Sequence, residues 1–443
     1  MPTNPSFRSQ WLLAAAVPLI AFAALIAALH FLNQAPASPT AASAGASGLG
    51  SGPAPQTTEA LVRDLQEAVA ADPGDAQLYA ELGDAYYQRA RETGDPAFYT
   101  RSQDALDAAL ELDPRNPEAT VGAGTLALAR HDFAAGLRLG QRAHALTPDL
   151  VRPYTVIADA QVELGRYRGA AHTLQRLVSL KPTLAAYSRV SYFRELHGDL
   201  DGAVKAMGLA VSAGAGSPES LAYVESLLGK LEIDRGNYGA AEHAYREALA
   251  ADPGFPAAGA GLARVEAAQG KLGAAIERYR SVVDRLPLPE YVIGLGEAEI
   301  AAGRHAAAER DLALVAVEAK LLRSAGVNVD VELALYEADH GNAARAVALG
   351  RSAWRRAPSV RSADAYAWAL HSAGRERAAT RMSRAAMRLG SRDPYFLYHA
   401  GMIAASAGDR GRARELLGEL VARSPAFSPL YGPRAAHELE ALR

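Results

Sequence analysis

The feature that most constrains this chain is that it restates itself at an interval of 34 residues. Residues 235–253 read RGNYGAAEHAYREALAADP, and residues 269–287 read QGKLGAAIERYRSVVDRLP. Glycine aligns with glycine, an alanine pair with an alanine pair, and Tyr245 with Tyr279. A fixed period of roughly 20 to 50 residues indicates a solenoid, because a unit of that size buries its apolar face only against neighbouring copies.

Aligning the chain on this stretch gives ten repeats, most of them 33 or 34 residues long. Their eighth position holds nothing larger than serine, and their twentieth position is alanine in most copies. Small side chains at these positions allow two antiparallel helices to cross closely, and glycine at the turn predicts a left-handed residue that ends the first helix. The repeats begin at Ala76, Pro117, Val151, Leu184, Ala222, Pro256, Pro289, Val327, Val360 and Pro394. The turn glycines are Gly165, Gly198, Gly236, Gly270, Gly303, Gly341, Gly374 and Gly408.

This pattern resembles the tetratricopeptide repeat (TPR) family, whose signature is W-x2-L-G-x2-Y…A-x3-F…P. The resemblance implies an all-α fold, a right-handed superhelix of about ten helix–turn–helix repeats over residues 76–427. We expect residues 59–75 to form an N-terminal capping helix and residues 428–443 a polar C-terminal capping helix. The layout is also similar to bacterial membrane-anchored or exported TPR proteins of no assigned activity.

The amino terminus is of a different kind. Trp11–Leu32 is a stretch of 22 residues without a formal charge. As a helix it is about 33 Å long, enough to cross a hydrocarbon core of about 30 Å. The segment 11–32, after a short tail at 1–10, therefore predicts a transmembrane signal anchor or an uncleaved signal sequence. Arg8 precedes it and no basic residue follows before Arg63, so the positive-inside rule leaves the rest of the chain outside the cytoplasm.

A cleaved signal peptide is the alternative, because Ala35–Ser38 reads APAS and is an acceptable cleavage site. The protein would then be secreted. Residues 33–58 are rich in alanine, serine, proline and glycine and carry no charge, which predicts a disordered linker. If it is retained, its mean reach is about 25–30 Å.

Composition and motifs argue against catalysis. The chain contains no cysteine, which excludes thiolate nucleophiles and cysteine-ligated zinc, and its eleven histidines show no metal-ligand spacing. It has no HExxH, G-x-S-x-G, P-loop or G-x-G-x-x-G motif in a suitable context. A net charge of −3 argues against nucleic acid as a partner. We therefore expect no enzyme activity, no cofactor, no metal and no small-molecule substrate.

The family resemblance implies that the first helix of each hairpin lines a concave groove and presents four of its positions to a protein or peptide ligand. Carried onto this chain, those positions predict a partner-binding face. Its members are Arg152, Asp159, Tyr192, Glu195, Tyr223, Lys230, Arg264, Glu297, Trp368, His371, Tyr395 and Tyr398. The aromatic groups near the carboxyl end are typical interface anchors if exposed. The alternative is that they pack between neighbouring helices.

The sequence thus predicts a non-catalytic TPR scaffold that binds a protein or peptide. The apolar segment would hold it in the membrane with its repeats in the periplasm or at the cell surface, where it would assist assembly of an envelope or secretion complex. Two alternatives remain: a regulatory or substrate-presenting subunit of an enzyme complex, such as one for glycosyl transfer or polysaccharide export, and a cytoplasmic TPR regulator.

Overall fold

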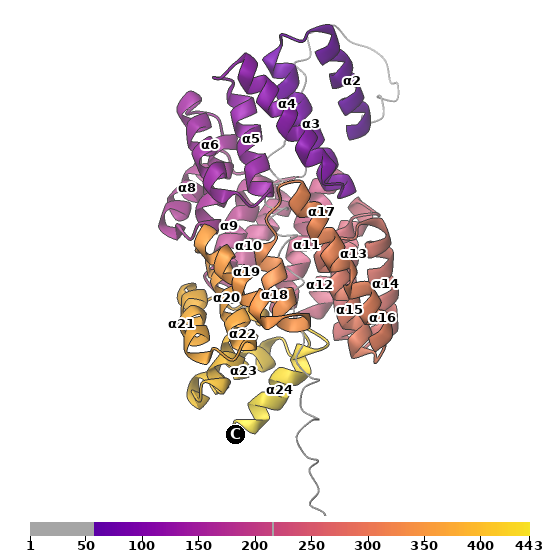
Figure 1. The fold of residues 1–443 in the computed structure, drawn as a ribbon, viewed down its shortest axis with the longest axis vertical. Coiled ribbons are helices and arrows are strands. Elements are labelled where there is room, and N and C mark those ends of the chain that lie inside the picture. Colours follow the sequence, from indigo (N-terminus) through magenta and orange to yellow (C-terminus); the bar gives the residue numbers. More distant parts are fainter. Residues whose placement is uncertain (1–56, 215–216) are drawn as a thin grey trace, which may run out of the picture.

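The computed structural model describes residues 57–214 and 217–443. Every regular element in these ranges is a helix, as the all-α prediction requires (Figure 1). The predicted tail and anchor, and nearly all of the linker, lie outside the described residues. Among the helices of the described ranges, none combines the length and apolar character needed to cross a membrane.

The first five hairpins, with the helix before them, comprise α2 (Thr58–Ala71), α3 (Ala76–Thr93), α4 (Ala97–Leu112), α5 (Pro117–Ala129), α6 (Phe133–Leu146), α7 (Arg152–Glu163), α8 (Tyr167–Leu180), α9 (Leu184–Leu196), α10 (Leu200–Ser212), α11 (Pro218–Asp234) and α12 (Tyr238–Ala251). The remainder comprises α13 (Pro256–Ala268), α14 (Leu272–Arg285), α15 (Pro289–Ala301), α16 (His305–Leu312), α17 (Leu314–Ser324), α18 (Asp330–His340), α19 (Ala343–Arg356), α20 (Val360–Ser372), α21 (Glu376–Ala386), the short 3₁₀ helix η2 (Met387–Leu389), α22 (Pro394–Ser406), α23 (Arg410–Arg423) and α24 (Tyr431–Ala441).

Small residues hold the two helices of each hairpin together. Gly83 on α3 leaves room for Leu106 and for the backbone of Ser102 on α4, and the Ser102 hydroxyl donates a 2.8 Å hydrogen bond to the Gly83 carbonyl. Ala241 and Ala275, at the twentieth position of their repeats, are fully buried. The close crossing that the repeat pattern predicts is therefore present.

The hairpins follow the predicted register with three departures, one of which is that α18 begins at Asp330, three residues after the predicted Val327. The α11 helix begins at Pro218, ahead of the predicted Ala222, because the Ser217 hydroxyl caps it by accepting from the backbone nitrogen of Ser220. The seventh repeat is longer because its second helix breaks at Ala313 into α16 and α17. The α17 helix has no counterpart in the other repeats.

One turn glycine was wrongly predicted to be left-handed. Gly341 has a φ of −124°, whereas the other seven predicted turn glycines have positive φ. The Glu337 carboxylate accepts a 2.9 Å hydrogen bond from the backbone nitrogen of Asn342, so a side chain shapes this turn. Conversely, His131 occupies the glycine position of the second hairpin and adopts a φ of 59°.

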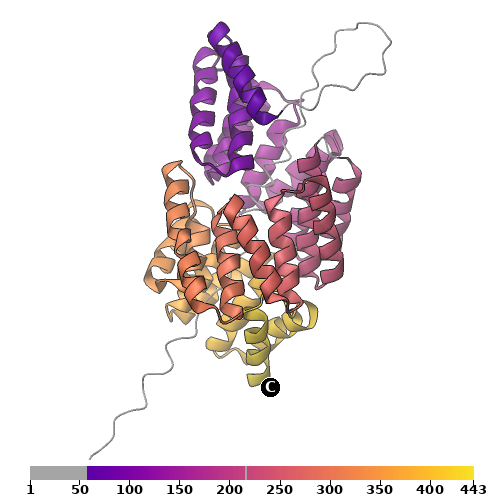
Figure 2. The same cartoon turned by 90° about the vertical axis from the view of Figure 1, so that its right-hand side faces the viewer.

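The array coils back on itself. Figure 1 shows α2 to α6 at one end of the long axis and α18 to α24 wrapping in front of α9 to α12, and Figure 2 gives the same arrangement from the side. The turn inside an early hairpin contacts the connection that precedes a hairpin about six repeats further along, at separations of 186 to 197 residues. We call this line of contacts the seam.

Hydrogen bonds recur along the seam. The Asn328 backbone nitrogen donates to the Arg130 carbonyl at 3.0 Å, and the Val360 nitrogen donates to the Tyr167 hydroxyl at 2.8 Å. Further along, the Ser424 hydroxyl donates to the Ile233 carbonyl at 2.9 Å. The seam therefore joins the second, third and fifth repeats to segments near the carboxyl end.

Turn glycines make the seam possible. A Cβ atom on Gly198 would overlap the carbonyl oxygen of Gly390, and one on Gly236 would overlap that of Arg423. Gly303, in a later repeat, faces open space although its φ of 75° equals that of Gly198. Gly198 and Gly236 thus have two roles: they adopt the left-handed turn conformation, and they allow a later backbone segment to lie against the turn.

Gly198→Ala and Gly303→Ala form a matched pair that separates these two roles. Both place a side chain in the left-handed region, which costs about 1–2 kcal/mol. We expect Gly198→Ala to lose roughly a further 1–3 kcal/mol of unfolding free energy, because its methyl group overpacks the seam. Chemical denaturation measures the difference, and hydrogen exchange near Gly390 should rise only in Gly198→Ala. Equal losses in the two variants would show that the seam contributes no stability.

Candidate functional site

The predicted partner-binding face lies on the inside of the coil and is mostly buried. Asp159, Tyr192, Glu195, Tyr223, Lys230, Glu297, Trp368, Tyr395 and Tyr398 are all buried. Arg152, Arg264 and His371 are half-buried. The expectation of an open, exposed groove at these residues is wrong for this structure, because the first helices of the hairpins contact one another and the later turn of the coil. Their contact with a partner stays a prediction.

The aromatic residues near the carboxyl end pack between helices, as the alternative interpretation has it. Trp368, only 7% exposed, stacks on His399 with ring centroids 4.4 Å apart, and its indole nitrogen donates a 2.7 Å hydrogen bond to Asp339. Tyr398 lies against Tyr431 of α24 at 5.1 Å. These rings join the last repeats to the terminal helix and expose no apolar anchor.

Tyr395 and His371 also have internal contacts. The Tyr395 ring meets Phe427 edge to face at 5.0 Å. The His371 ring stacks on Trp368, and its Nδ1 lies 3.0 Å from a carboxylate oxygen of Glu376. Both contacts lie within or between neighbouring repeats.

Ion pairs line the inner face of the first repeats. Arg152 on α7 bridges Asp84 on α3, at 2.8 Å, and Glu118 on α5. The Arg189 guanidinium donates to both carboxylate oxygens of Asp159 at 2.8 to 3.1 Å, and both side chains are almost fully buried. Such forked pairs fix the orientation of both groups. The structure therefore brings Arg152 and Asp159 into two separate clusters.

A second buried cluster surrounds Lys230. Its ammonium lies 2.7 Å from Glu195, 2.6 Å from Asp234 and 3.5 Å from Asp393 at the start of α22. The three carboxylates lie close enough together to hold a metal ion, yet the ammonium group already supplies a cation among them. Since Asp393 belongs to the later turn of the coil, this cluster also ties the seam.

Burial shifts the titration of these groups. Burial raises the pKa of Asp159 to about 6, although Arg189 acts in the opposite sense. Burial likewise raises the pKa of Glu195 above its usual value, and Lys230 partly offsets this. Burial alone would lower the pKa of Lys230, but Asp234 and Glu195 raise it above its usual value, so the ammonium stays charged. The cluster therefore keeps its cation, while burial makes ionisation of its carboxylates costly.

Arg264 and Glu297 border a small space beside Tyr395. Its volume is about 10 Å³, at or below the roughly 10–15 Å³ that one water needs. Tyr279 and Phe427 also line it, so it is enclosed by the sixth repeat, the seventh repeat and the C-terminal segment. No ligand of useful size fits there.

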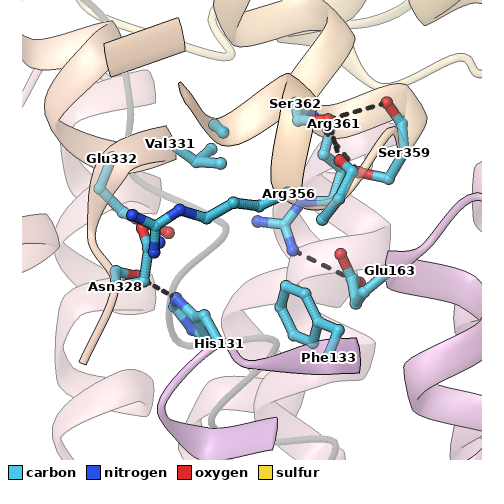
Figure 3. Close-up of a pocket in the computed structure, with 12 residues that line it drawn as sticks. His131, Phe133, Glu163, Asn328, Val331, Glu332, Arg356, Ser359, Arg361 and Ser362 are labelled. Carbon is cyan, nitrogen blue, oxygen red and sulfur yellow. Dashed lines mark hydrogen bonds and ion pairs between the residues drawn. The ribbon is translucent and has the colours of Figure 1, made fainter. Parts of the chain in front are cut away.

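A larger pocket opens at the seam (Figure 3). Its cavity volume is about 30 Å³, enough for a few waters at roughly 10–15 Å³ each. The His131 ring nitrogen donates to the Asn328 carbonyl at 2.5 Å on one side, and the Arg361–Glu163 ion pair, at 3.7 Å, lies on the other. The pocket thus separates two of the contacts that close the seam, and it is too small for a peptide.

Sequence reasoning missed several members of these clusters, including Arg189, Asp393 and Arg361. One signal was available: the thirteenth position of three repeats is acidic, at Glu163, Asp234 and Asp339, although most repeats hold a neutral residue there. All three carboxylates are buried; Glu163 and Asp339 pair with side chains of other repeats, and Asp234 pairs with Lys230 of its own helix. An acid that recurs at an otherwise neutral position of a packed helix indicates an ionic or hydrogen-bonding role.

Truncating Trp368 tests the packing interpretation. We expect Trp368→Ala to lose about 3–5 kcal/mol of unfolding free energy, because it removes a buried ring and leaves Asp339 without its indole donor. Leu209→Ala is the control, since Leu209 is 50% exposed and its truncation should change stability by less than about 0.5 kcal/mol. Equal melting temperatures for wild type and Trp368→Ala would contradict the structure.

Glu290 gives a pH test on the inner face. Burial raises its pKa from 4.5 to about 7, and Glu332 adds to the rise. The unfolded chain therefore releases this proton at lower pH than the folded chain. As a result, the contribution of Glu290 to the free energy of unfolding falls as pH rises from about 4.5 to 7. Relative to Glu290→Gln, the wild type should lose up to roughly 3 kcal/mol of unfolding free energy across that pH range. Denaturation of both proteins at pH 5 and pH 8 measures it, and parallel pH profiles would contradict the buried position.

Comparison with known protein families identifies repeats in three segments of the chain. Models of the tetratricopeptide repeat match residues 97–150, 155–218 and 232–292. No curated protein matches the chain.

The solved structures to which the chain is similar share little sequence with it. TTC0263, a thermophilic TPR protein in Thermus thermophilus, is 19% identical over 47% of this chain and 100% of its own, with a TM-score of 0.37. YrrB, a TPR protein with an unusual peptide-binding site, is 16% identical over 53% of this chain and 97% of its own, at 0.25. The human IFIT1 dimer with PPP-AAAA is 14% identical over 82% of this chain and 86% of its own, at 0.46. Three segments of the chain thus match the tetratricopeptide repeat, and the described residues form ten stacked helical hairpins around them.

Proposed function

We propose that this protein is a membrane-tethered, extracytoplasmic TPR scaffold that binds a protein or peptide segment along its inner face and assists assembly of an envelope or secretion complex. The TPR repeats support a protein-binding scaffold. The tether, the compartment and the complex are inferred from the apolar segment Trp11–Leu32 and the charge distribution around it.

The observation that carries the binding role is the charged band on the inner face. This band consists of Arg189 with Asp159, Lys230 with its three carboxylates, and Arg361 with Glu163, from the third to fifth repeats, the ninth repeat and the start of α22. Burying ions costs more than burying apolar groups of similar size, so folding alone does not favour this lining. A polar lining can form hydrogen bonds with the backbone of a bound peptide and ion pairs with its charged side chains.

Access to this face requires the seam to open. Opening must break the hydrogen bonds at Arg130, Tyr167 and Ile233, of which those at Tyr167 and Ile233 are buried. A segment that binds inside would replace internal ion pairs with its own, which would offset part of the cost of opening. Partner binding and seam opening are then linked, and whatever stabilises the seam weakens binding.

A disulfide across the seam tests this mechanism, and the chain contains no cysteine that would interfere. The backbones of Arg130 and Asn328 are joined by a 3.0 Å hydrogen bond, which places them within reach of a cysteine pair. We expect the full chain to enrich specific sequences from a displayed peptide library. Oxidised Arg130→Cys/Asn328→Cys should fail to do so and should recover on reduction.

The two single-cysteine variants are the controls, because they keep the substitutions without the lock. Retention of the same peptides by the oxidised double variant would place binding outside the inner face. Failure of every form to enrich a peptide would argue against the scaffold role itself.

The tether has its own test. A reporter that is active only outside the cytoplasm, fused after Arg443, should be active, and the protein should stay with membranes after a carbonate wash. A soluble, shortened protein beginning at Ser38 would replace the anchor by a cleaved signal peptide.

A further inference from the structure

Charge is segregated between two segments of the chain, each of which contributes helices to the outer surface. Residues 57–113, which form α2 to α4, contain thirteen carboxylates and four arginines, a net charge of −9. Residues 343–392, which include α19 and α21, contain eleven arginines and two carboxylates, a net charge of +9. The whole chain carries only −3, so its near-neutrality hides two strongly charged faces.

The basic face is an ordered stripe on one helix. Arg377, Arg381 and Arg384 recur along α21 at intervals of four and three residues, and all three are exposed. In the part of the chain that the structure describes, none of the three lies within ion-pair distance of a carboxylate. Like charges one helical turn apart destabilise a helix, so the stripe works against folding.

Some arginines on other outer helices form ion pairs, unlike the three of this stripe. Arg246 pairs with Glu242 at 2.5 Å, and Arg278 pairs with Glu266 at 2.7 Å. Arg388, which continues the stripe, is held by the Pro358 carbonyl and lies over the Tyr167 ring.

The acidic face carries a stripe of the same spacing. Asp104, Asp107 and Glu111 recur along α4 at intervals of three and four residues, and all are exposed. Asp107 accepts a hydrogen bond from Gln103, but within the described ranges none of the three pairs with a basic side chain at ion-pair distance. Leu112, 47% exposed, adds an apolar group beside them.

The two stripes match in reverse order. An α21 helix laid antiparallel on an α4 helix brings Arg377 opposite Glu111, Arg381 opposite Asp107 and Arg384 opposite Asp104. Each stripe extends over eight residues of helix, a rise of about 10 Å. Guanidinium and carboxylate groups at these positions can form forked pairs, which are the strongest surface ion pairs.

We propose that the chain associates with a second copy of itself, head to tail, through the basic stripe of α21 and the acidic stripe of α4. Figure 1 places α4 at one end of the long axis and α21 toward the other, so both stripes of one molecule can be engaged at once. A contact between two different patches is heterologous and extends into a row of molecules unless it closes into a ring. This assembly goes beyond the proposed peptide binding, which concerns the inner face.

Charge reversal tests the proposal on the full chain, kept in a nonionic detergent so that Trp11–Leu32 does not itself cause association. Sedimentation of the wild type should show mass rising with concentration at about 10 mM salt and falling to the single chain at about 1 M, as the screening length drops from about 30 Å to about 3 Å. Arg377→Glu/Arg381→Glu and Asp107→Arg/Glu111→Arg should each abolish the association. Mixing the two variants should restore it, because each keeps one intact stripe.

The matched control is Arg168→Glu/Arg176→Glu on α8, which makes the same charge change at two exposed residues outside both stripes. It should associate like the wild type, and all variants should melt at similar temperatures. A wild type that stays a single chain at low salt and high concentration would overturn the proposal, as would mixed variants that remain separate. One further outcome would overturn the proposal: the wild type does not self-associate, but it binds phosphatidylglycerol vesicles and Arg377→Glu/Arg381→Glu does not. The basic stripe would then be a lipid-binding site.

Discussion

The arrangement of this protein depends on the close approach of two backbone segments at the seam. Gly198 and Gly236 bring the turns of early hairpins against the carbonyl groups of Gly390 and Arg423, where no side chain fits. Once these segments meet, the first helices of the hairpins are enclosed by the coil. The burial of the inner residues and the clusters of ions follow from that closure.

Closure explains why ions rather than apolar groups lie inside. Lys230 lies on α11 and Asp393 at the start of α22, so their 3.5 Å contact exists only when the coil is closed. A buried ammonium needs its carboxylates, and breaking such a pair costs far more than the pair contributes. A coil in which α11 met a different later segment would leave Lys230 without Asp393. The cluster therefore favours the observed pairing of early and late repeats.

The sequence predicts the fold because neighbours in a solenoid share one pattern. The 34-residue period and the small residues at two positions are enough to predict ten hairpins, and α3 to α23 form them. The seam is different, because it joins residues 186 to 197 apart and leaves no periodic signal. Gly198 and Gly303 look alike in sequence and share a φ of 75°, yet only Gly198 has a backbone against it. The groove residues were assigned by family position alone, which cannot show that Trp368 packs on His399.

A closed coil also changes how stability is distributed. In an open solenoid each repeat interacts with its two neighbours, so unfolding can begin at an end and spread inward. Here the second, third and fifth repeats also contact segments about six repeats further along, through Arg130, Tyr167 and Ile233. Loss of the last three hairpins, α18 to α23, would remove those contacts from repeats far away in sequence, so the ends and the middle should unfold together. The same coupling means that a partner bound inside the coil would affect the early and the late repeats together, because opening the seam releases both.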